Sequence, residues 1–458
     1  MKFVTAAVGG ELLAGAPETV VCRVNTDSRQ TRPGDLYFAL KGERFDGHDF
    51  LAAVTAAGAT AVVCARDRVP APLPACGVIA VACPRAALGQ LAAAYRAEFH
   101  LPVVAVGGSN GKTTTKELLA AVLRQRGPTL WSEASFNNDI GVPLTLLRLE
   151  AAHWAAVVET GTNHPGELAP LLRLAQPRYG VLTNIGREHL EFFGNLAGVA
   201  EEEGALATAL PADGKLFLNG DDAWADKIAA RSPAPVVRVG LDRNNAWCAH
   251  AIRLLPEGMQ FQVTAPQAAW NGEYRIRLLG RHQVTNALLA LAVGAELGLT
   301  PEQVRDGFAE ARPAKMRLEL WDAGGVKVLD DSYNANADSV RAALQLLSEL
   351  PCAGRRLAVL GDMEELGTHS AAAHAEAGRL AAEWGVSQLL AVGRMAGVMA
   401  AAAREAGLTR VLEFAEVEAA APALKALARS GDVVLLKASR ATRIERVVAG
   451  WRPAAGGK

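Results

Sequence analysis

The chain has 458 residues and a formal net charge of −1; 50% of its residues are hydrophobic and 21% are charged. This composition is typical of a globular protein. The chain is too long to fold around a single hydrophobic core, so we expect two to four domains. No net positive charge attracts nucleic acid or an anionic membrane. An anionic ligand must therefore be held by local groups.

The cysteine pattern and the apolar runs indicate a cytoplasmic protein. Six cysteines are scattered through the sequence without a Cys-x-x-Cys pair, which favours reduced thiols over a disulfide framework or a zinc ribbon. The apolar N-terminus is interrupted at residues 9–11 before it reaches the length of a signal peptide, and no run reaches the roughly 18 apolar residues of a membrane helix. We expect a monomer that binds no nucleic acid and does not insert into a membrane.

Residues 1–84 are predicted to form a small N-terminal α/β domain. Short β-type runs occur at 20–24, 61–64 and 78–81, and an Ala-rich segment at 51–57 has helical character.

Residues 85–313 are predicted to form a central domain. A helical pattern at 86–99 leads into an apolar strand at 101–106, and strands then alternate with helices up to Arg312-Pro313. This alternation indicates a mostly parallel sheet with helices on both faces.

Residues 314–458 are predicted to form a smaller, Rossmann-like open α/β domain. Its expected strands, separated by Ala-rich helices, are 326–329, 356–360, 389–392 and 433–436. No Gly-x-Gly-x-x-Gly follows a strand, so this fold type does not argue for NAD.

A glycine-rich segment between the strand at 101–106 and a helix predicted at 116–126 has the order of a phosphate-binding loop. Its amide N–H groups can converge on an anion at a helix N-terminus, Lys112 can reach the β- and γ-phosphates, and the Thr113 hydroxyl can ligate Mg²⁺. The spacing is Gly-x-x-Gly-Lys-Thr, with Val106 where the common motif has glycine. The alternative is an ordinary turn with a surface lysine, which the strand–loop–helix context disfavours. The predicted phosphate-binding residues are Gly108, Ser109, Asn110, Gly111, Lys112, Thr113 and Thr114.

Two candidate metal ligands follow apolar strands. Glu159 ends the run 154–158 and His189 lies beyond the run that starts at Leu182. Either residue alone is more often structural, but open α/β sheets place ligand groups at the carboxyl ends of strands. The acidic run 201–203 is equally compatible with a solvated helix face.

Several motifs together resemble the Mur ligases of peptidoglycan synthesis, and the resemblance runs nearly end to end. At the N-terminus, Thr26-Asp27-Ser28-Arg29 and the segments 33–42 and 46–50 are similar to the family's UDP-sugar-binding domain. The short phosphate-loop spacing is also that of the family. The resemblance implies that the UDP-linked substrate is bound by Ser28, Arg29, Lys41, Asp46 and His48.

Segments 136–143, 159–164, 184–191 and 280–287 resemble central-domain motifs of the family. They imply that Lys112, Glu159 and His189 are catalytic. They also imply that ATP is contacted by Asn286, Arg317 and Asp331 in addition to the loop, although Gln283 stands where the family usually has asparagine. The metal ligands implied by this resemblance are Glu159 and His189, in addition to Thr113 of the loop.

Two C-terminal motifs, 330–336 and 361–367, resemble the branch of the family that adds D-alanyl-D-alanine. The Asp-Asn-Pro-Arg segment of the enzyme that adds the third residue is absent. Lys437-Ala438-Ser439-Arg440 resembles the family's Lys-Gly-Ser-Arg. The implied dipeptide-binding residues are Asn334, Asn336, Lys437, Ser439 and Arg440.

One departure from the family concerns a lysine that related ligases carbamylate to help hold a second Mg²⁺. By register, this position is Glu203. Our hypothesis is that Glu203 supplies a permanent carboxylate in place of the modified lysine.

The resemblance implies an ATP- and Mg²⁺-dependent ligase that joins D-alanyl-D-alanine to UDP-N-acetylmuramoyl-tripeptide through an acyl phosphate. The alternatives are the tripeptide-forming enzyme or folylpolyglutamate synthetase, although the Asp-Ser-Arg segment argues against the latter. A P-loop NTPase without ligase activity and a small-molecule kinase are alternatives of other classes. The sequence leaves open whether the third peptide residue is diaminopimelate or lysine, and which base deprotonates the incoming amine.

Overall fold

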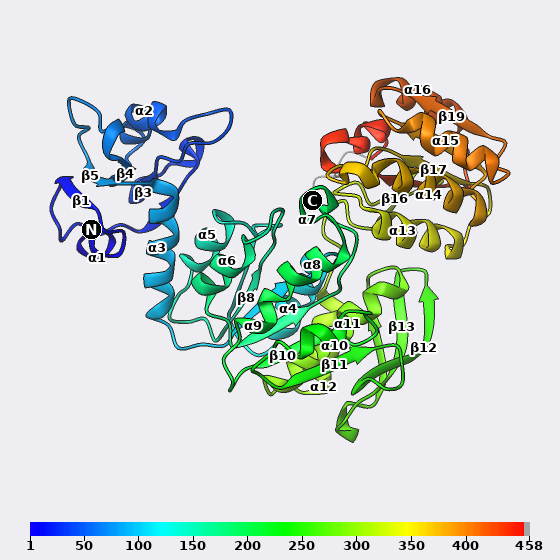
Figure 1. Cartoon of the computed structure of the whole chain (residues 1–458), viewed down its shortest axis with the longest axis horizontal. Helices are drawn as coiled ribbons and strands as arrows, with labels where there is room; N and C mark the ends of the chain where they lie inside the picture. Colours follow the sequence, from blue (N-terminus) through cyan, green and yellow to red (C-terminus); the bar gives the residue numbers. More distant parts are fainter. Residues whose placement is uncertain (453–458) are drawn as a thin grey trace.

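The computed structural model describes residues 1–452, which form three lobes with one β-sheet each. In Figure 1 the N-terminal lobe (blue) and the C-terminal lobe (yellow to red) stand on opposite sides of the central lobe (mainly green). The predicted three-domain α/β class is confirmed.

The N-terminal lobe contains a five-stranded sheet in the order β1-β5-β4-β3-β2, in which only β1 is antiparallel to its neighbour. Its central strands are buried along their whole length, which explains their continuous apolar runs. The strand expected at 20–24 begins only at Arg23, because Val20 lies 76% exposed outside the sheet. The elements are α1 (Lys2–Ala7), β1 (Glu11–Ala14), β2 (Arg23–Asn25), β3 (Asp35–Phe38), α2 (Leu51–Ala56), β4 (Ala61–Ala65) and β5 (Gly77–Val81).

Helix α3 (Pro84–Ala97) is shared between the first two lobes. Ala87, Leu88 and Leu91 pack into the apolar core under the first sheet, whereas Ala92 belongs to a core of the central lobe. The helix therefore joins the lobes through apolar packing on both sides.

The central lobe has a nine-stranded sheet in the order β14-β13-β12-β11-β10-β9-β6-β8-β7. Six strands and one end of β12 run parallel, and β12, β13 and β14 extend the sheet as an antiparallel meander. The strands are β6 (Val103–Gly107), β7 (Thr129–Trp131), β8 (Ala155–Glu159), β9 (Tyr179–Leu182), β10 (Lys215–Asn219), β11 (Val236–Gly240), β12 (Trp247–Leu255), β13 (Gly258–Thr264) and β14 (Gly272–Ile276).

Helices cover both faces of this sheet. One face packs on α4, α11 and α12, which share an apolar core with the sheet, and the other packs on α6 and α9. The helices are α4 (Lys112–Arg124), α5 (Gly141–Leu146), α6 (Leu168–Ala175), α7 (Leu190–Phe193), α8 (Leu196–Glu203), α9 (Ala205–Thr208), α10 (Ala225–Ala229), α11 (Arg281–Glu296) and α12 (Pro301–Glu310).

The C-terminal lobe has a six-stranded sheet in the order β15-β16-β20-β17-β18-β19, parallel except for the edge strand β15. The strands are β15 (Glu319–Ala323), β16 (Val326–Asp330), β17 (Arg356–Leu360), β18 (Gln388–Val392), β19 (Val411–Phe414) and β20 (Val433–Lys437). The helices are α13 (Ala337–Glu349), α14 (Ser370–Glu383), α15 (Ala396–Glu405) and α16 (Val417–Leu427).

Within residues 1–452, no helix combines the length and the apolar character needed to cross a bilayer. The longest, α11, has 16 residues, whereas a spanning helix needs about 20.

Candidate active site

The glycine-rich loop connects β6 to α4 at the carboxyl edge of the central sheet. Gly108 has φ +108°, and a Cβ at this position would lie 2.4 Å from Oγ1 of Thr183. Gly111, at φ +87°, precedes α4 and lies against Asn286. Helix α4 begins at Lys112, four residues earlier than predicted, so its free first-turn amides directly follow the loop.

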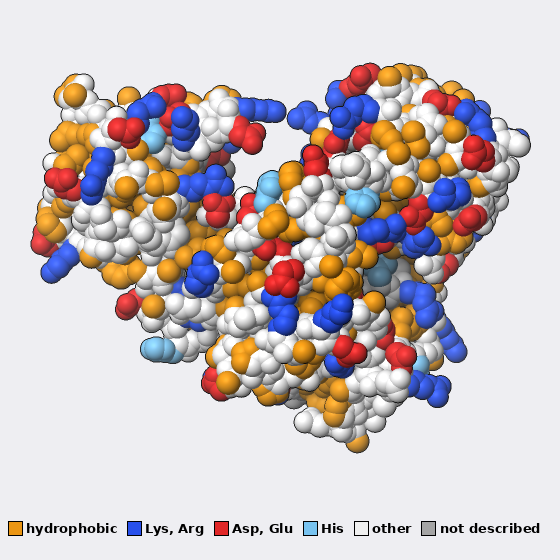
Figure 2. All heavy atoms as spheres, in the orientation of Figure 1, with side chains coloured by type: hydrophobic (Ala, Val, Ile, Leu, Met, Phe, Trp, Pro, Cys, Tyr) orange, Lys and Arg blue, Asp and Glu red, His pale blue; other side chains and the backbone are white. Residues whose placement is uncertain are grey.

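A cleft of about 1110 Å³ opens in front of this loop and is bordered by residues of all three lobes. Figure 2 shows the molecule hollowed between the N- and C-terminal lobes, above the central lobe. The cleft is large enough for a nucleotide together with a second substrate. The predicted residues that line it are Ser109, Asn110, Gly111, Lys112, Thr113, Thr114, Glu159, His189, Asn286, Arg317, Asp331, Asn334, Asn336 and Lys437.

The predicted residues that do not line the cleft are Ser28, Arg29, Lys41, Asp46, His48, Gly108, Glu203, Ser439 and Arg440. Gly108 is nevertheless part of the phosphate loop, and its amide donates to the carboxylate of Glu203 behind the loop.

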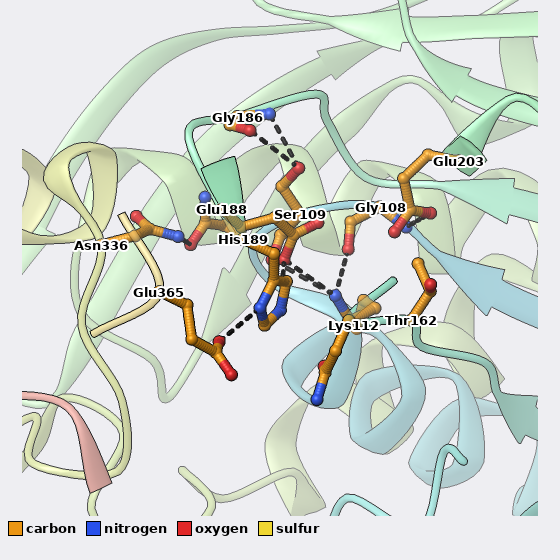
Figure 3. Close-up of polar contacts among 12 residues, drawn as sticks. Gly108, Ser109, Lys112, Thr162, Gly186, Glu188, His189, Glu203, Asn336 and Glu365 are labelled. Carbon is orange, nitrogen blue, oxygen red and sulfur yellow. Dashed lines mark hydrogen bonds and ion pairs between the residues drawn. The ribbon is translucent and has the colours of Figure 1, made fainter. Parts of the chain in front are cut away.

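The Lys112 ammonium is folded back onto its own loop. Its Nζ donates to the carbonyls of Gly108 (2.5 Å) and Ser109 (3.3 Å) and lies 3.4 Å from a Glu188 carboxylate oxygen (Figure 3). Burial alone would lower the pKa of Lys112, but Glu188, Glu203 and Glu159 together raise it above the ordinary value. The side chain therefore remains a cation at the mouth of the loop.

Glu159, the last residue of β8, faces the first turn of α4. Its Oε1 accepts hydrogen bonds from the Thr113 hydroxyl (3.2 Å) and the Asn137 amide (3.0 Å), while its own N–H donates to Ser132. The other oxygen, Oε2, is buried without a hydrogen-bond partner. A buried, unsatisfied carboxylate oxygen beside a threonine hydroxyl fits a hard cation such as Mg²⁺.

Lys116 is a buried residue of this site that the motif analysis missed. Its Nζ donates to the carbonyls of Ser132 (2.8 Å) and Ala134 (2.5 Å) and lies 3.9 Å from Oε2 of Glu159. The side chain has no solvent exposure. The sequence did contain a signal: Lys116 follows Lys112 by four residues, which places it one turn further along the same face of the helix.

His189 lies at the N-terminus of α7 with φ +47°, a left-handed conformation uncommon outside glycine. Its Nδ1 is hydrogen-bonded to the carboxylate of Glu365, from the C-terminal lobe, and its Nε2 lies 3.8 Å from Glu188 (Figure 3). Glu365 belongs to the motif 361–367, but no local feature of that motif distinguishes it from its neighbours.

Glu203, at the end of α8, is only 1% exposed. Its Oε2 accepts a 2.6 Å hydrogen bond from the Gly108 amide, and its Oε1 is buried without a partner. Burial raises the pKa of Glu203 to about 7, although Lys112 lowers it in part. Of the acidic run, Glu201 is exposed, so the solvated-face interpretation applies to that residue and not to Glu203.

The opposite side of the loop carries the residues expected to contact the nucleotide base. The Asn286 amide donates to Gln283 (2.8 Å), which lies one helical turn before it on α11. The Arg317 guanidinium stacks on the Tyr333 ring at 4.1 Å. His282 also lines the cleft, where the residue is exposed to solvent.

The predicted dipeptide-binding residues differ in solvent exposure and in the partners of their polar groups. Lys437 is 2% exposed and donates to Asp331 and to the Asn334 carbonyl. Ser439 bonds the Ala335 carbonyl and accepts the Glu364 amide. By contrast, the side chain of Arg440 is 54% exposed and pairs with Glu445.

Asn336 links the lobes, since its amide donates to Asn110 of the phosphate loop (2.9 Å). It also caps the N-terminus of α13.

The predicted UDP-substrate residues lie together on the N-terminal lobe. Arg29 pairs with Asp27, and Lys41 pairs through its backbone with the strand-like segment at Asp46. Asp46 accepts from Nδ1 of His48, whose Nε2 accepts the Ala65 amide. His48 and Asp46 thus hold the loop 41–48 against β4.

No group of three or more His, Cys, Asp or Glu side chains in the described range 1–452 forms a preassembled metal cluster. The donors near the loop are instead the Thr113 hydroxyl and unsatisfied oxygens of Glu159 and Glu203. This set fits Mg²⁺, which usually takes one or two carboxylates and completes its shell with water and substrate phosphates.

Comparisons with known proteins agree with this arrangement. Three family models match the chain: "Mur ligase family, catalytic domain" at 21–96, "Mur ligase middle domain" at 106–294 and "Mur ligase, glutamate ligase domain" at 316–440. The UDP-N-acetylmuramoyl-tripeptide–D-alanyl-D-alanine ligase of Escherichia coli (strain K12) is 38% identical over 456 residues, covering 98% of this chain and 97% of that protein.

Solved structures give the same result. A crystal structure of MurF from Acinetobacter baumannii superposes with a TM-score of 0.89 at 33% identity, covering 98% of each chain. MurF from Thermotoga maritima in complex with ADP superposes with a TM-score of 0.81 at 27% identity, covering 94% of this chain and 96% of that one. The chain therefore belongs to the Mur ligase family, among the relatives of the UDP-N-acetylmuramoyl-tripeptide–D-alanyl-D-alanine ligases.

Proposed function

We propose that this protein is an ATP-dependent ligase that joins D-alanyl-D-alanine to the terminal carboxylate of UDP-N-acetylmuramoyl-tripeptide in peptidoglycan precursor synthesis. The observation that carries the proposal is the 38% identity, over nearly the full length, to the Escherichia coli ligase of that name. The cleft bordered by three lobes supports it, because a reaction of three substrates needs a site that they can share. A cytoplasmic monomer is part of the same proposal.

The proposed reaction has two steps. The tripeptide carboxylate attacks the γ-phosphorus of ATP, giving an acyl phosphate and ADP; the dipeptide amine then attacks the acyl carbon, and phosphate leaves. Lys112 would leave the carbonyls of its loop and stabilise negative charge on the transferring phosphoryl group. The amide of Gly111 and the first turn of α4 would hold the β-phosphate, because the amides of Gly108, Ser109 and Asn110 already donate to Glu203 and Asn184.

Mg²⁺ would be held by Thr113 and Glu159, with His189 and Glu203 next to them, and would supply charge neutralisation at the phosphates. The 2.6 Å contact of Glu203 with Gly108 supports the hypothesis that this carboxylate stands in for a carbamylated lysine. The helix brings the shorter side chain close enough to touch the loop itself.

Binding of the other substrates is proposed on two surfaces. The UDP-linked peptide would enter along the N-terminal lobe near Ser28, Arg29 and Lys41, with Asp46 and His48 shaping the loop. The dipeptide carboxylate would be recognised by Arg440, whose guanidinium is more exposed than the ammonium of Lys437. Asn334 and Lys437 both line the cleft.

A coupled phosphate-release assay with purified protein, ATP and Mg²⁺ tests the proposal. Phosphate release that requires both the UDP-tripeptide and D-alanyl-D-alanine is expected, together with a UDP-pentapeptide product seen by mass spectrometry. ATP turnover without either peptide substrate would instead support a P-loop NTPase, and a stable phosphorylated product a kinase. Parallel reactions with diaminopimelate- and lysine-containing tripeptides would identify the third residue.

A further inference from the structure

The loop 186–191 of the central lobe contacts the cleft on one side and the C-terminal lobe on the other. Arg187 donates to Asp338 at the start of α13 and to Glu376 on α14, with distances of 2.8 Å and 2.6 Å. The Glu191 amide donates to the Glu365 carbonyl at 3.0 Å. This one loop therefore both carries His189 and anchors the C-terminal lobe.

The His189 imidazole makes a hydrogen bond to the C-terminal lobe, while Phe193 of its own lobe lies edge-on to the ring. Its Nδ1 contacts Oε2 of Glu365, and Figure 3 shows the Glu365 carboxylate pointing at the ring from the segment after β17. Because an ionised carboxylate only accepts hydrogen bonds, Nδ1 carries a proton in this contact, and a neutral imidazole then has its lone pair on Nε2. Nε2 is the atom on the side of Glu188, which lines the cleft beside Lys112.

The backbone on both sides of this contact is strained. His189 has φ +47° and Glu365 has φ +60°, and neither is a glycine. Left-handed conformations of such residues are unfavourable and persist where the surrounding structure requires them. Two such residues facing each other across a lobe boundary indicate that their orientation matters more than local stability.

We propose that Glu365 is a positioning residue for His189: docking of the C-terminal lobe sets the tautomer and orientation of the imidazole, so that Nε2 faces the nucleotide phosphates. The proposal deepens the ligase function and rests on it for its catalytic consequence. It makes assembly of the site conditional on closure, because the carboxylate that orients His189 arrives with the lobe expected to bring the dipeptide. Arg187, which holds two carboxylates of the same lobe, stabilises the docked state.

Glu364, the residue before Glu365, provides a control. Glu364 belongs to the same motif, but its carboxylate pairs with Arg394 inside the C-terminal lobe at 2.8 Å. Glu364→Gln removes one charge one residue away and leaves the His189 contact in place.

The first experiment measures the tautomer directly, in protein without metal or nucleotide. The full chain is labelled with ¹⁵N-histidine, and the His189 signals are assigned by their loss in His189→Gln. A protonated Nδ1 is expected in the unmodified protein and in Glu364→Gln. Glu365→Ala should shift toward the other tautomer or a mixture, and so should Arg187→Ala, which lacks two ion pairs to the C-terminal lobe. An unchanged His189 tautomer in Glu365→Ala would overturn the proposal.

The second experiment measures how loss of the Glu365 carboxylate affects metal binding and catalysis. Mutation of a residue that hydrogen-bonds a metal ligand typically lowers metal affinity or activity 10- to 100-fold. Glu365→Ala is expected to weaken Mn²⁺ binding to the ADP complex about tenfold by electron paramagnetic resonance, and to lower kcat with KM values for both peptide substrates within about twofold. Glu364→Gln should match the unmodified protein in both. Unchanged Mn²⁺ affinity and kcat in Glu365→Ala would count against the proposal. If the protein has no ligase activity at all, kcat cannot be measured, but the tautomer and Mn²⁺ measurements still test the role of Glu365.

Discussion

The ammonium of Lys116 lies 3.9 Å from the carboxylate of Glu159, and both side chains are almost fully shielded from solvent. Lys116 also donates to two carbonyls of the segment after β7, so it ties that segment to α4 and leaves Glu159 with a buried cation beside it. The first prediction concerns this pair.

Lys116→Met should lower the free energy of unfolding by about 3 kcal/mol, because removing one member of a buried charged pair leaves the other uncompensated. The thermal midpoint of the full chain should fall accordingly. Lys327→Met, at an exposed position of β16, is the control and should change little. A midpoint equal to that of the control would show that Lys116 does not stabilise the site.

The sequence predicts the regular parts of this protein well, because they depend on local pattern. The runs at 61–64, 78–81, 356–360 and 433–436 all lie within buried parallel strands, where continuous apolar residues are the expected pattern. The run at 20–24 was misleading because hydrophobicity alone does not say whether Val20 finds a partner strand.

Long-range pairing explains what the sequence missed in the site. Glu365 meets His189 across 176 positions, and nothing local to either residue indicates this contact. The burial of Lys116 depends on the segment after β7, whose carbonyls it bonds, and the sequence of the helix alone does not indicate this contact. For Glu203 the register predicted the position, but only tertiary structure gives its contact with Gly108.

The second prediction concerns Lys112. Lys112→Met should reduce kcat by about 10²- to 10³-fold, as expected when one group that stabilises transition-state charge is removed. The variant should still fold, with a lower thermal midpoint, because the change leaves the buried Glu188 carboxylate without its cation. Steady-state kinetics with Lys327→Met as the charge-matched control would test this, and a loss smaller than tenfold would contradict the proposed role.

The third prediction concerns the carboxylate that replaces a modifiable lysine. Wild-type activity should not rise when bicarbonate is added, because Glu203 is a carboxylate already. Glu203→Ala should shift the Mg²⁺ concentration needed for half-maximal activity upward by about tenfold, as for other groups that support a metal site. Titration of activity with Mg²⁺ in both proteins measures this; stimulation by bicarbonate or an unchanged Mg²⁺ dependence would count decisively against the hypothesis.

The fourth prediction tests dipeptide recognition. Arg440→Ala should raise KM for D-alanyl-D-alanine by about 10- to 100-fold, which corresponds to losing a hydrogen bond between charged groups, while KM for ATP stays the same. Arg446 is a matched control, because its side chain is also 54% exposed and pairs with a glutamate of the same lobe. If both variants raise the dipeptide KM equally, recognition is not specific to Arg440.

The last prediction concerns acid stability of the C-terminal lobe. Asp432, which is 2% exposed, accepts hydrogen bonds from the Arg355 side chain (2.7 Å) and from the amides of Arg355 (2.8 Å) and Arg429 (3.0 Å). Burial would raise the pKa of Asp432, but the Arg355 side chain and these amides outweigh it and hold the pKa below the ordinary value. A lowered native pKa means that the carboxylate stabilises the fold above the unfolded-state pKa of about 3.9.

That contribution is lost as the pH falls through the lower native pKa. Asp432→Asn should therefore unfold at a lower temperature than wild type at pH 7, by an amount equivalent to about 1.5–3 kcal/mol for hydrogen bonds to a charged group. The difference in thermal midpoint between wild type and Asp432→Asn should become smaller below about pH 4, because only the wild type takes up a proton at this site. Thermal midpoints from pH 7 to pH 3 measure this, with Asp306→Asn at an exposed position of α12 as the control. A gap that stays constant across this range would mean that the charge of Asp432 contributes nothing to stability.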